Sequence, residues 1–439
     1  MSSPSACFPL EKKIDTIIRF FLYLFIFWLP YSIAVVESSV IIALILWMIK
    51  RSLALPDALN ASSSFKDKFL KSLMVFKPKS SAIDRAVLFF LFVCILSVVG
   101  SPFVKSSFYG FITKTVEWFV IYYLVLEVFT EKRHIFIALG ITVFTGIATV
   151  LDSLWQFYFS QRDIFLGYQI VKGERATASF KTANTFAGYL TLLIPLVFVL
   201  MPQSRRLKMV LLSAVILSFW SLAVSFTIGA VGSILMGGIF FSLWILQIKK
   251  NQYFFAVSSF CLLIFVIVFW VWTESNMGIK ALFNHRLTSW QWRLTIWNDA
   301  LVMIRESPLF GHGVNTFMRI FQVYDNSARY SPTYAHNCFI QLAAETGLVG
   351  LGAFLWIVWG IAKTALRSAR LFYSYGQDKM GIICLGILSG VIAFLGHSFI
   401  DTNLYSLQLS AFFWYVIGLL FSVENLFSHS TTFLQPIKK

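Results

Sequence analysis

The sequence predicts an all-α polytopic membrane protein, and composition, apolar runs and charge distribution all support this fold class. Of the 439 residues, 58% are hydrophobic, 18% are aromatic and only 13% are charged. A soluble protein of this length could not cover so much apolar surface, so the lipid bilayer must be its solvent. The five cysteines are scattered and form no CxxC pair, so we expect neither a disulfide framework nor a zinc site.

Twelve apolar runs are candidates for transmembrane helices, because a crossing helix needs roughly 20 apolar residues. They lie near residues 16–36, 38–50, 84–101, 108–129, 135–158, 184–201, 208–226, 228–248, 252–273, 340–362, 381–399 and 404–423. The second run is short, and we expect it to share a bent hairpin with the first. The runs divide the chain into N-terminal helices, a large polar loop and C-terminal helices, which span 1–273, 274–339 and 340–439.

The distribution of Lys and Arg predicts the orientation. With a cytoplasmic N-terminus, 23 of the 36 basic residues fall on inner segments and 11 on outer loops. This excess on one side predicts that both termini are cytoplasmic, and it explains the net charge of +16 without nucleic acid as a partner. Ten of the 11 outer charges lie in two loops, 160–183 and 274–339, which indicates that these loops bind an anionic ligand.

The larger loop should begin with an interfacial helix over 287–306, which carries three tryptophans of the kind found at membrane surfaces. The helix should end by Ser307, because Pro308 lacks an amide donor and disfavours helix before it. We expect the following Gly311-His312-Gly313 segment to form a flexible turn.

The smaller loop ends just ahead of an apolar helix, in the segment ASFKTANTFAGYL. Arg175 and Lys181 precede this helix, and Asn184 and Thr185 are suitable caps for it. A capped helix start with solvated charges is the alternative to an anion-binding role.

The chemistry that the two loops indicate is phosphate binding by arginine. The sequence contains no DxD, HExxH or GxSxG pattern and no acidic pair spaced to hold a divalent ion, so we expect no metal and no cofactor. A guanidinium group binds phosphate oxygens bidentately, stays charged and can neutralise a diphosphate leaving group. Arg175, Arg286 and Arg293 are the candidates, with solvated arginines on a polar face as the alternative.

His336 is the candidate general base, at the point where the polar loop enters an apolar helix. An imidazole can take a proton from a hydroxyl at neutral pH. Its neighbour Asn337 could orient the ring or bind sugar, while the alternative for His336 is a role in capping the helix. His397 and Asp401 are spaced one helical turn apart, so we expect them to bond to each other and to support the site.

Four ordered segments resemble the C-terminal half of the O-antigen ligase and O-antigen polymerase superfamily. They are ASFKTANTFAGYL, RLTIWNDALVMIRESPLFGHGVNTF, AHNCFIQLAAETGLVGLGAFLW and HSFIDTNLYSLQLSAFFWYVIGLL. The first departs from the family pattern at Lys181-Thr182-Ala183, where glycine and proline are usual. The resemblance covers roughly residues 170–423 and leaves the N-terminal helices without a motif.

The resemblance implies an inverting, metal-independent glycosyltransferase of the C type, with its active site on the periplasmic face of the bacterial inner membrane. The implied donor is a glycan on undecaprenyl diphosphate, and the implied acceptor of a ligase is a lipid A–core sugar. Arg293 and Arg175 would bind the diphosphate, with Arg286 as a further candidate, and His336 would be the base or orient the acceptor. Membrane lipids and other glycan-assembly proteins are the remaining expected partners.

Three alternatives stay open. An O-antigen polymerase would use another lipid-linked repeat unit as acceptor, but one dominant outer loop and twelve helices favour a ligase. A protein oligosaccharyltransferase of the same superfamily is a more distant alternative. A lipid-linked oligosaccharide flippase would show repeated halves and unpaired charge near the midplane, whereas the sequence has no internal repeat and Lys114 and Glu117 are spaced to pair.

Overall fold

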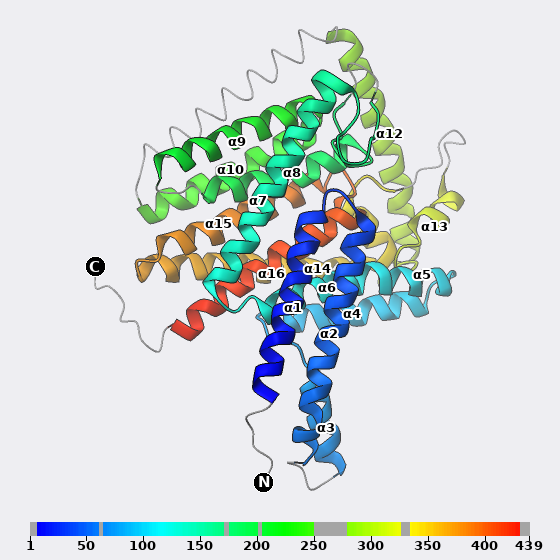
Figure 1. Ribbon diagram of the computed structural model, residues 1–439. Coiled ribbons are helices and arrows are strands. Elements are labelled where there is room, and N and C mark those ends of the chain that lie inside the picture. Colours follow the sequence, from blue (N-terminus) through cyan, green and yellow to red (C-terminus); the bar gives the residue numbers. More distant parts are fainter. Residues whose placement is uncertain are drawn as a thin grey trace.

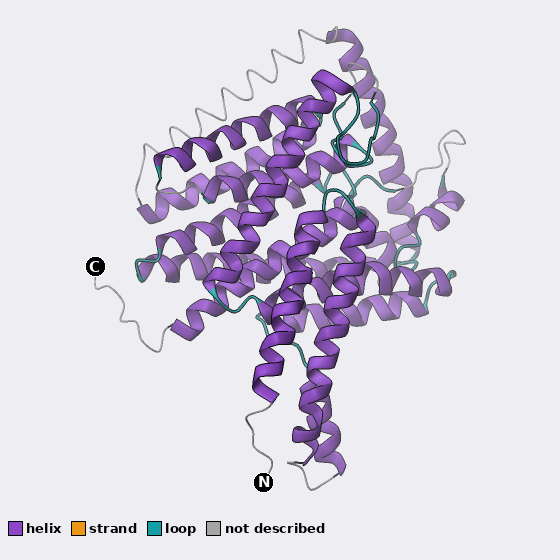
Figure 2. Cartoon of the chain, in the orientation of Figure 1, coloured by secondary structure: helices purple, strands orange, loops and turns teal. Residues whose placement is uncertain are grey.

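The computed structural model describes residues 7–60, 65–170, 175–200, 204–249, 279–325 and 334–430. Within these ranges the chain is almost entirely helical (Figure 2), apart from one isolated β-bridge between Arg162 and Gln169. The predicted all-α fold class is confirmed for this part of the chain.

The helices follow one another with short connections, except for the two loops singled out by their charge. In chain order the elements are α1 (Cys7–Trp28), α2 (Ile33–Asn60), α3 (Phe65–Val75), α4 (Asp84–Val99), α5 (Val104–Gly110), the π-helical η1 (Phe111–Val116), α6 (Glu117–Val128), α7 (Lys132–Trp155), the π-helical η2 (Gln156–Ser160), α8 (Ala183–Val199), α9 (Arg205–Val224), α10 (Ile228–Lys249), α12 (Ile279–Glu306), α13 (Phe317–Tyr324), α14 (Cys338–Ser374), α15 (Asp378–His397), the 3-10 helix η3 (Asn403–Tyr405) and α16 (Leu407–Ser430).

Seven of the described helical segments are long and apolar enough to cross a membrane, which fits a polytopic membrane protein. They are Ile33–Pro56, Lys132–Ser160, Arg205–Val224, Ile228–Gln247, Cys338–Ser374, Asp378–His397 and Leu407–Leu426, and Ala183–Val199 is a shorter apolar helix. Twelve spans were predicted. The predicted span at 252–273 lies outside the described residues, α4 has only 16 residues, and the run at 108–129 is divided by η1.

The prediction of a short second helix at 38–50 is wrong. Helix α2 extends from Ile33 to Asn60, because Glu37, Ser38 and Ser39 lie within its first turns and do not interrupt it. It packs along α1. Helix α3, in the connection between the predicted second and third spans, was not predicted.

The centre of the molecule is formed by α15 and α16, whose apolar segments are the most buried of the seven. Helix α15 packs against α8, α10 and α14, and α16 packs against α6 (Figure 1). The ring of Trp414 on α16 stacks on that of Trp118 on α6, with 6.1 Å between their centroids. Large apolar side chains such as Leu88, Phe144 and Trp359 face outward, as expected of surfaces that contact lipid.

Helix α12 runs across the ends of the stacked helices, at one side of the molecule (Figure 1). It ends at Glu306, as Pro308 predicts, but begins earlier than the predicted residue 287. A second apolar cluster joins α12 and α13 to the first turns of α14; its members are Ile296, Ala300, Met303, Ile304, Phe317, Ile320, Phe321, Ala335, Ala343 and Ala344. This cluster packs the polar loop against the start of α14, the helix that follows His336.

Candidate functional site

His336 lies immediately before α14, on the turn that joins the polar loop to this helix. Its φ of +49° is left-handed, a conformation that is uncommon for non-glycine residues and is often found at functional sites. Asn337 is the N-cap of α14, and its side-chain oxygen accepts the amides of Phe339 and Ile340 at 2.9 and 3.0 Å. Asn337 is buried and caps the helix, which fixes the turn at His336, while its predicted contact with sugar stays a prediction.

The imidazole of His336 lies between a carboxylate and an aromatic ring. Its Nδ1 is 3.7 Å from Oδ1 of Asp401, a contact longer than a hydrogen bond. The ring of Trp292, on α12, lies with its centroid 4.9 Å from that of the imidazole. Because Nδ1 faces Asp401, Nε2 is the nitrogen that can accept a proton from a substrate.

The predicted bond between His397 and Asp401 is replaced by two other contacts. Helix α15 ends at His397, so Asp401 does not follow it on the same helix. The side-chain nitrogen of Asn403 lies 3.0 Å from His397 Nδ1, while Asp401 faces His336. His397 is buried, and its contact with Asn403 joins the end of α15 to η3.

Asp401 links the imidazole to the arginines. Burial alone would raise the pKa of Asp401, but His336, His397 and the amide of Thr402 hold it well below its usual range. Burial lowers the pKa of Arg293, and the charge of Asp401 opposes this effect. Since an arginine normally titrates above about pH 12, the guanidinium and the carboxylate are both charged at neutral pH.

Arg293 projects from α12 and is half-buried. Its Nε is buried and has no hydrogen-bond partner among the described residues, so a donor is left for an anion. Four residues further along α12, Trp297 Nε1 donates to the carbonyl of Ala335 at 2.9 Å. The helix that carries Arg293 is thereby bonded to the residue directly before His336.

Arg175 is held by the start of α8 and by the turn between α9 and α10. Its Nε donates to the carbonyl of Ser225 at 2.9 Å, and one terminal nitrogen donates to Thr227 Oγ1 at 2.8 Å and to Asn184 Oδ1. The N-cap of α8 is Thr182, not the predicted Asn184 or Thr185. The side chain of Asn184 can accept from Arg175 because Thr182, two residues earlier, provides the cap.

Two buried polar side chains fix the loop that presents Arg175. Gln156 Oε1 accepts the amides of Thr177 and Ala178, both at 2.9 Å. Asp152 accepts the amide of Ile164 at 2.7 Å. These bonds tie the described parts of the loop, on either side of residues 171–174, to the end of α7 and to η2.

The structure brings together most of the site residues that the sequence predicts. Arg175 and Arg293, from the two basic loops, both act electrostatically on His397, beside the His336–Asp401 pair. Lys181 is exposed near the start of α8. Arg286 lies on α12, but its side chain is outside the described part of the chain.

His312 was predicted to lie in a flexible turn, and the structure corrects this. Its amide donates to the carbonyl of Ala344 at 3.0 Å, and the amide of Gly313 donates to the carbonyl of Glu345 at 2.9 Å. Helix α14 is kinked at Gly347, where φ is +71°. Because of the kink, the carbonyls of Ala344 and Glu345 can accept these two bonds, which hold the turn against α14.

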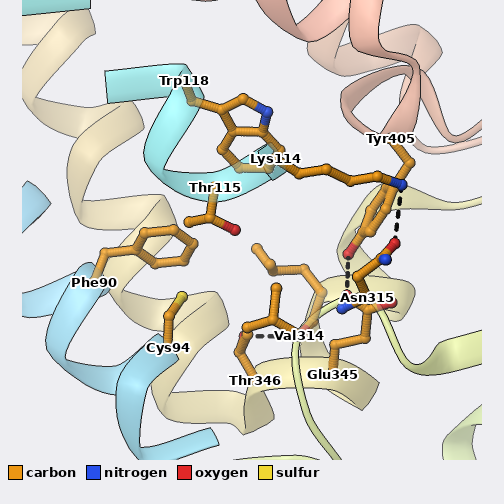
Figure 3. Close-up of a pocket in the computed structure, with 11 residues that line it drawn as sticks. Phe90, Cys94, Lys114, Thr115, Trp118, Val314, Asn315, Glu345, Thr346 and Tyr405 are labelled. Atoms are coloured by element: carbon orange, nitrogen blue, oxygen red, sulfur yellow. Dashed lines mark hydrogen bonds between the residues drawn. The ribbon is translucent and has the colours of Figure 1, made fainter. Parts of the chain in front are cut away.

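Glu345, a residue not among the candidates from the sequence, lies buried on α14 and lines a small pocket (Figure 3). Its carboxylate accepts four hydrogen bonds, from the amides of Asn315 and Phe317, from Gln341 and from Tyr405. An acidic residue inside an apolar run is itself a signal of function, so this residue could have been found from the sequence.

Lys114 also belongs to this pocket, which corrects its predicted pairing with Glu117. Lys114 Nζ bonds to Asn315 Oδ1 at 2.9 Å, and Glu345 is the carboxylate that acts on it electrostatically. Lys114 lies in the π-helical η1, where two side chains three residues apart do not face each other as they do on an α-helix.

Residues 213–355 match a family model described as O-antigen ligase. The matched segment runs from α9 into α14 and contains Arg293, His336 and Glu345. A protein of Haemophilus influenzae, named only as uncharacterized, is 27% identical over 128 residues. That match covers 27% of this chain and 30% of the relative, so it carries no function.

Residues 213–355 are thus similar to the O-antigen ligase family, and the apolar helices fit a multi-pass membrane protein. Within the matched residues, this similarity supports the resemblance that the sequence motifs indicate.

Proposed function

We propose that this protein is an O-antigen ligase that transfers a glycan from undecaprenyl diphosphate to a hydroxyl of a lipid A–core sugar, with inversion at the transferred carbon. The observation that carries the proposal is the pair of His336 and Asp401, with 3.7 Å between Nδ1 and Oδ1, beside the basic residues Arg293 and Arg175, whose charges act on this part of the site. The description of the matching family as O-antigen ligase supports this choice of acceptor.

The proposed reaction is a direct displacement. The acceptor hydroxyl oxygen attacks the anomeric carbon on the face opposite to the diphosphate, and a new C–O bond forms there. The bond from the anomeric carbon to the diphosphate oxygen breaks, and the leaving diphosphate takes its electron pair. The hydroxyl proton passes to Nε2 of His336, while Asp401 stabilises the imidazolium that results.

The two arginines stabilise the diphosphate as its charge develops. Arg293 has an unpartnered buried Nε among the described residues, so it can bind phosphate without first breaking another bond. Arg175 donates to the carbonyl of Ser225, to Thr227 Oγ1 and to Asn184 Oδ1, and these bonds hold its guanidinium group in place for the proposed contact with the diphosphate. The proposal assigns neutralisation to these groups, and predicts that a chelator leaves transfer intact.

In the proposed orientation both termini are cytoplasmic and the α12 side is periplasmic, where a lipid A–core acceptor and the flipped donor are exposed. The bacterial inner membrane is the proposed location, and Lys181 and Arg286 are proposed as further contacts to the donor.

The test is a chromosomal deletion in the source bacterium, with the surface glycans resolved on a gel. Loss of capped lipopolysaccharide with retention of long lipid-linked polymer is expected for a ligase. Capping with single repeat units would show a polymerase instead. An unchanged glycan pattern together with normal lipid-linked precursors would refute a role in glycan transfer.

A further inference from the structure

We infer that Glu345 is a positioning residue that fixes the location of His336 through a relay of hydrogen bonds. This inference rests on the proposed function in that it assigns a role relative to the proposed base. The relay joins three parts of the fold: the kinked start of α14, the turn at His336 and the helix α12.

The first step of the relay lies within α14. Gln341 Nε2 donates to Oε1 of Glu345 at 3.2 Å. This bond fixes which way the amide of Gln341 points, since its nitrogen must face the carboxylate. Its oxygen then faces the turn before α14, where Oε1 accepts the amide of Ala335 at 3.1 Å. Ala335 directly precedes His336.

The second step reaches α12. The carbonyl of Ala335 accepts Trp297 Nε1 at 2.9 Å, so both backbone polar groups of this residue are held, one from α14 and one from α12. Ala335 is fully buried. With these two groups held and the N-cap at Asn337 fixing the other side, the left-handed backbone at His336 has little freedom to move.

The carboxylate itself is held by donors from α14, from residues 315–317 and from η3, and Figure 3 shows two of these residues, Asn315 and Tyr405. Its Oε2 accepts the amide of Asn315 at 2.8 Å and the hydroxyl of Tyr405 at 3.2 Å, and its Oε1 also accepts the amide of Phe317 at 3.3 Å. Together with Gln341 these make four donors, which is about the number that a carboxylate can accept. No acceptor position is left for a substrate, so Glu345 acts through its neighbours.

A neutral amide cannot replace this carboxylate. Glutamine has one acceptor oxygen and two N–H donors, and among the four donors only the hydroxyl of Tyr405 can turn to accept, so in Glu345→Gln at least one buried donor would face another donor. Whenever the new amide nitrogen faces Gln341, the bond from Gln341 is lost and its amide can rotate away from Ala335. Because small displacements of a catalytic group can cost up to about 100-fold in rate, we expect transfer to fall roughly 10- to 100-fold, with donor affinity unchanged.

A double-mutant cycle with His336→Ala tests whether the effect passes through His336. Transfer is measured with lipid-linked donor and acceptor in detergent, alongside the amount of protein in the membrane. If Glu345 acts through His336, Glu345→Gln should lower transfer in the wild-type background and have little further effect in His336→Ala. If the double variant lost transfer by the product of the two single losses, the inference would be overturned. Glu131→Gln, at an exposed acid remote from the site, is the control and should leave transfer unchanged.

A second readout needs no activity, so it separates this inference from the proposed function. In His336→Cys, the rate of labelling by a small charged thiol reagent reports how position 336 is held, and wild-type protein gives the background. We expect Glu345→Gln to change this rate several-fold, and Trp297→Phe, which removes only the indole donor to Ala335, to change it in the same direction. Unchanged labelling in both backgrounds would overturn the inference, even if the wild-type protein transfers glycan. Absence of transfer by wild-type protein would overturn the function, while the labelling still decides the relay.

Discussion

His336 and Asp401 face each other across the junction of two helices, with 3.7 Å between Nδ1 and Oδ1. The junction is closed by the backbone, because the amide of Cys338 at the start of α14 donates to the carbonyl of Ser398 at 2.8 Å just after α15. The distance between imidazole and carboxylate is therefore set by the packing of α14 on α15, and not by the two side chains alone.

The first prediction concerns Asp401→Asn, which keeps the shape of the side chain and removes its charge. The imidazole loses the group that orients it and stabilises its protonated form, so transfer should fall at least about 10-fold. Donor affinity should stay the same or rise, because the charge of Asp401 also opposes anion binding at Arg293. Steady-state kinetics would separate the two effects, and a rise in KM with an unchanged kcat would contradict the assignment.

The same variant should change the dependence of stability on pH. The pKa of Asp401 is held below its usual range in the folded protein. The carboxylate therefore stabilises the fold at any pH above its pKa in the unfolded chain, which is about 4. This contribution is lost as the pH falls through the lower, folded value. Melting temperatures in detergent between pH 7 and pH 3 should therefore fall more steeply for wild-type protein than for Asp401→Asn.

Much of the fold could be predicted from the sequence, because apolar runs and proline positions act locally. The end of α12 at Glu306 follows from Pro308, and the start of α14 follows from the change in polarity after His336. The true length of α2 could not be predicted in this way, since Glu37, Ser38 and Ser39 are tolerated within its first turns although only Ser39 is buried.

The site could be predicted less completely, because its contacts depend on how helices end. The spacing of His397 and Asp401 suggested a bond, but α15 stops between them and Asp401 turns toward His336. Which donors face Glu345 also depends on how the helices pack, and this cannot be predicted from the residues next to Glu345 in the sequence. The arginine and histidine candidates could be named from the sequence because their residue types limit the chemistry that they can perform, and their roles stay predictions.

The second prediction concerns the kink of α14. In Gly347→Ala the new methyl group would lie 2.1 Å from the carbonyl oxygen of Leu309, at a residue with φ of +71°. Such backbone strain costs about 1–3 kcal/mol, and the clash adds to it, so the melting temperature and membrane level should fall. Gly352→Ala is the matched control on the same helix, because nothing lies within 4 Å of its added methyl group. Equal stability of the two variants would show that the kink tolerates a side chain.

The third prediction concerns orientation. The distribution of basic residues predicts that α3 is cytoplasmic and α13 periplasmic. Both Lys68 on α3 and Gln322 on α13 are exposed. In sealed cells, Gln322→Cys should react with a membrane-impermeant thiol reagent, and Lys68→Cys should react only after the membrane is opened. The wild-type protein supplies the background from its own cysteines. The reverse pattern would put the proposed site on the wrong side for the donor.

The fourth prediction concerns phosphate binding by Arg293. Arg293→Ala should raise the KM for the donor and lower transfer by about 100-fold, a typical loss for one transition-state donor, while the protein still reaches the membrane. Arg293→Lys should be partly active, since it keeps the charge and loses the bidentate geometry. Arg305→Ala, at an exposed position near the end of the same helix, should have little effect.

Arg175 offers a weaker test of the same idea, because it also holds the turn between α9 and α10. Its alanine variant should lose both transfer and stability. Full activity of Arg293→Ala and Arg175→Ala together would remove the basis for a diphosphate clamp, and inhibition by a chelator would contradict its independence of metal.

The last prediction concerns His336 itself. The acceptor hydroxyl is a poor nucleophile, and a positioned base typically contributes about 10²–10⁴-fold in rate. His336→Ala should therefore lose most transfer and keep donor affinity, because the arginines still bind the diphosphate. His312→Ala is the control: its Nε2 lies 2.9 Å from the carbonyl of Met303, so it should lose some stability and little transfer. The measurement is the transfer rate across pH, with donor affinity determined separately. If His336→Ala lost donor binding and kept the pH profile of the wild-type protein, His336 would be a phosphate ligand or a structural residue, and the base would have to be sought elsewhere.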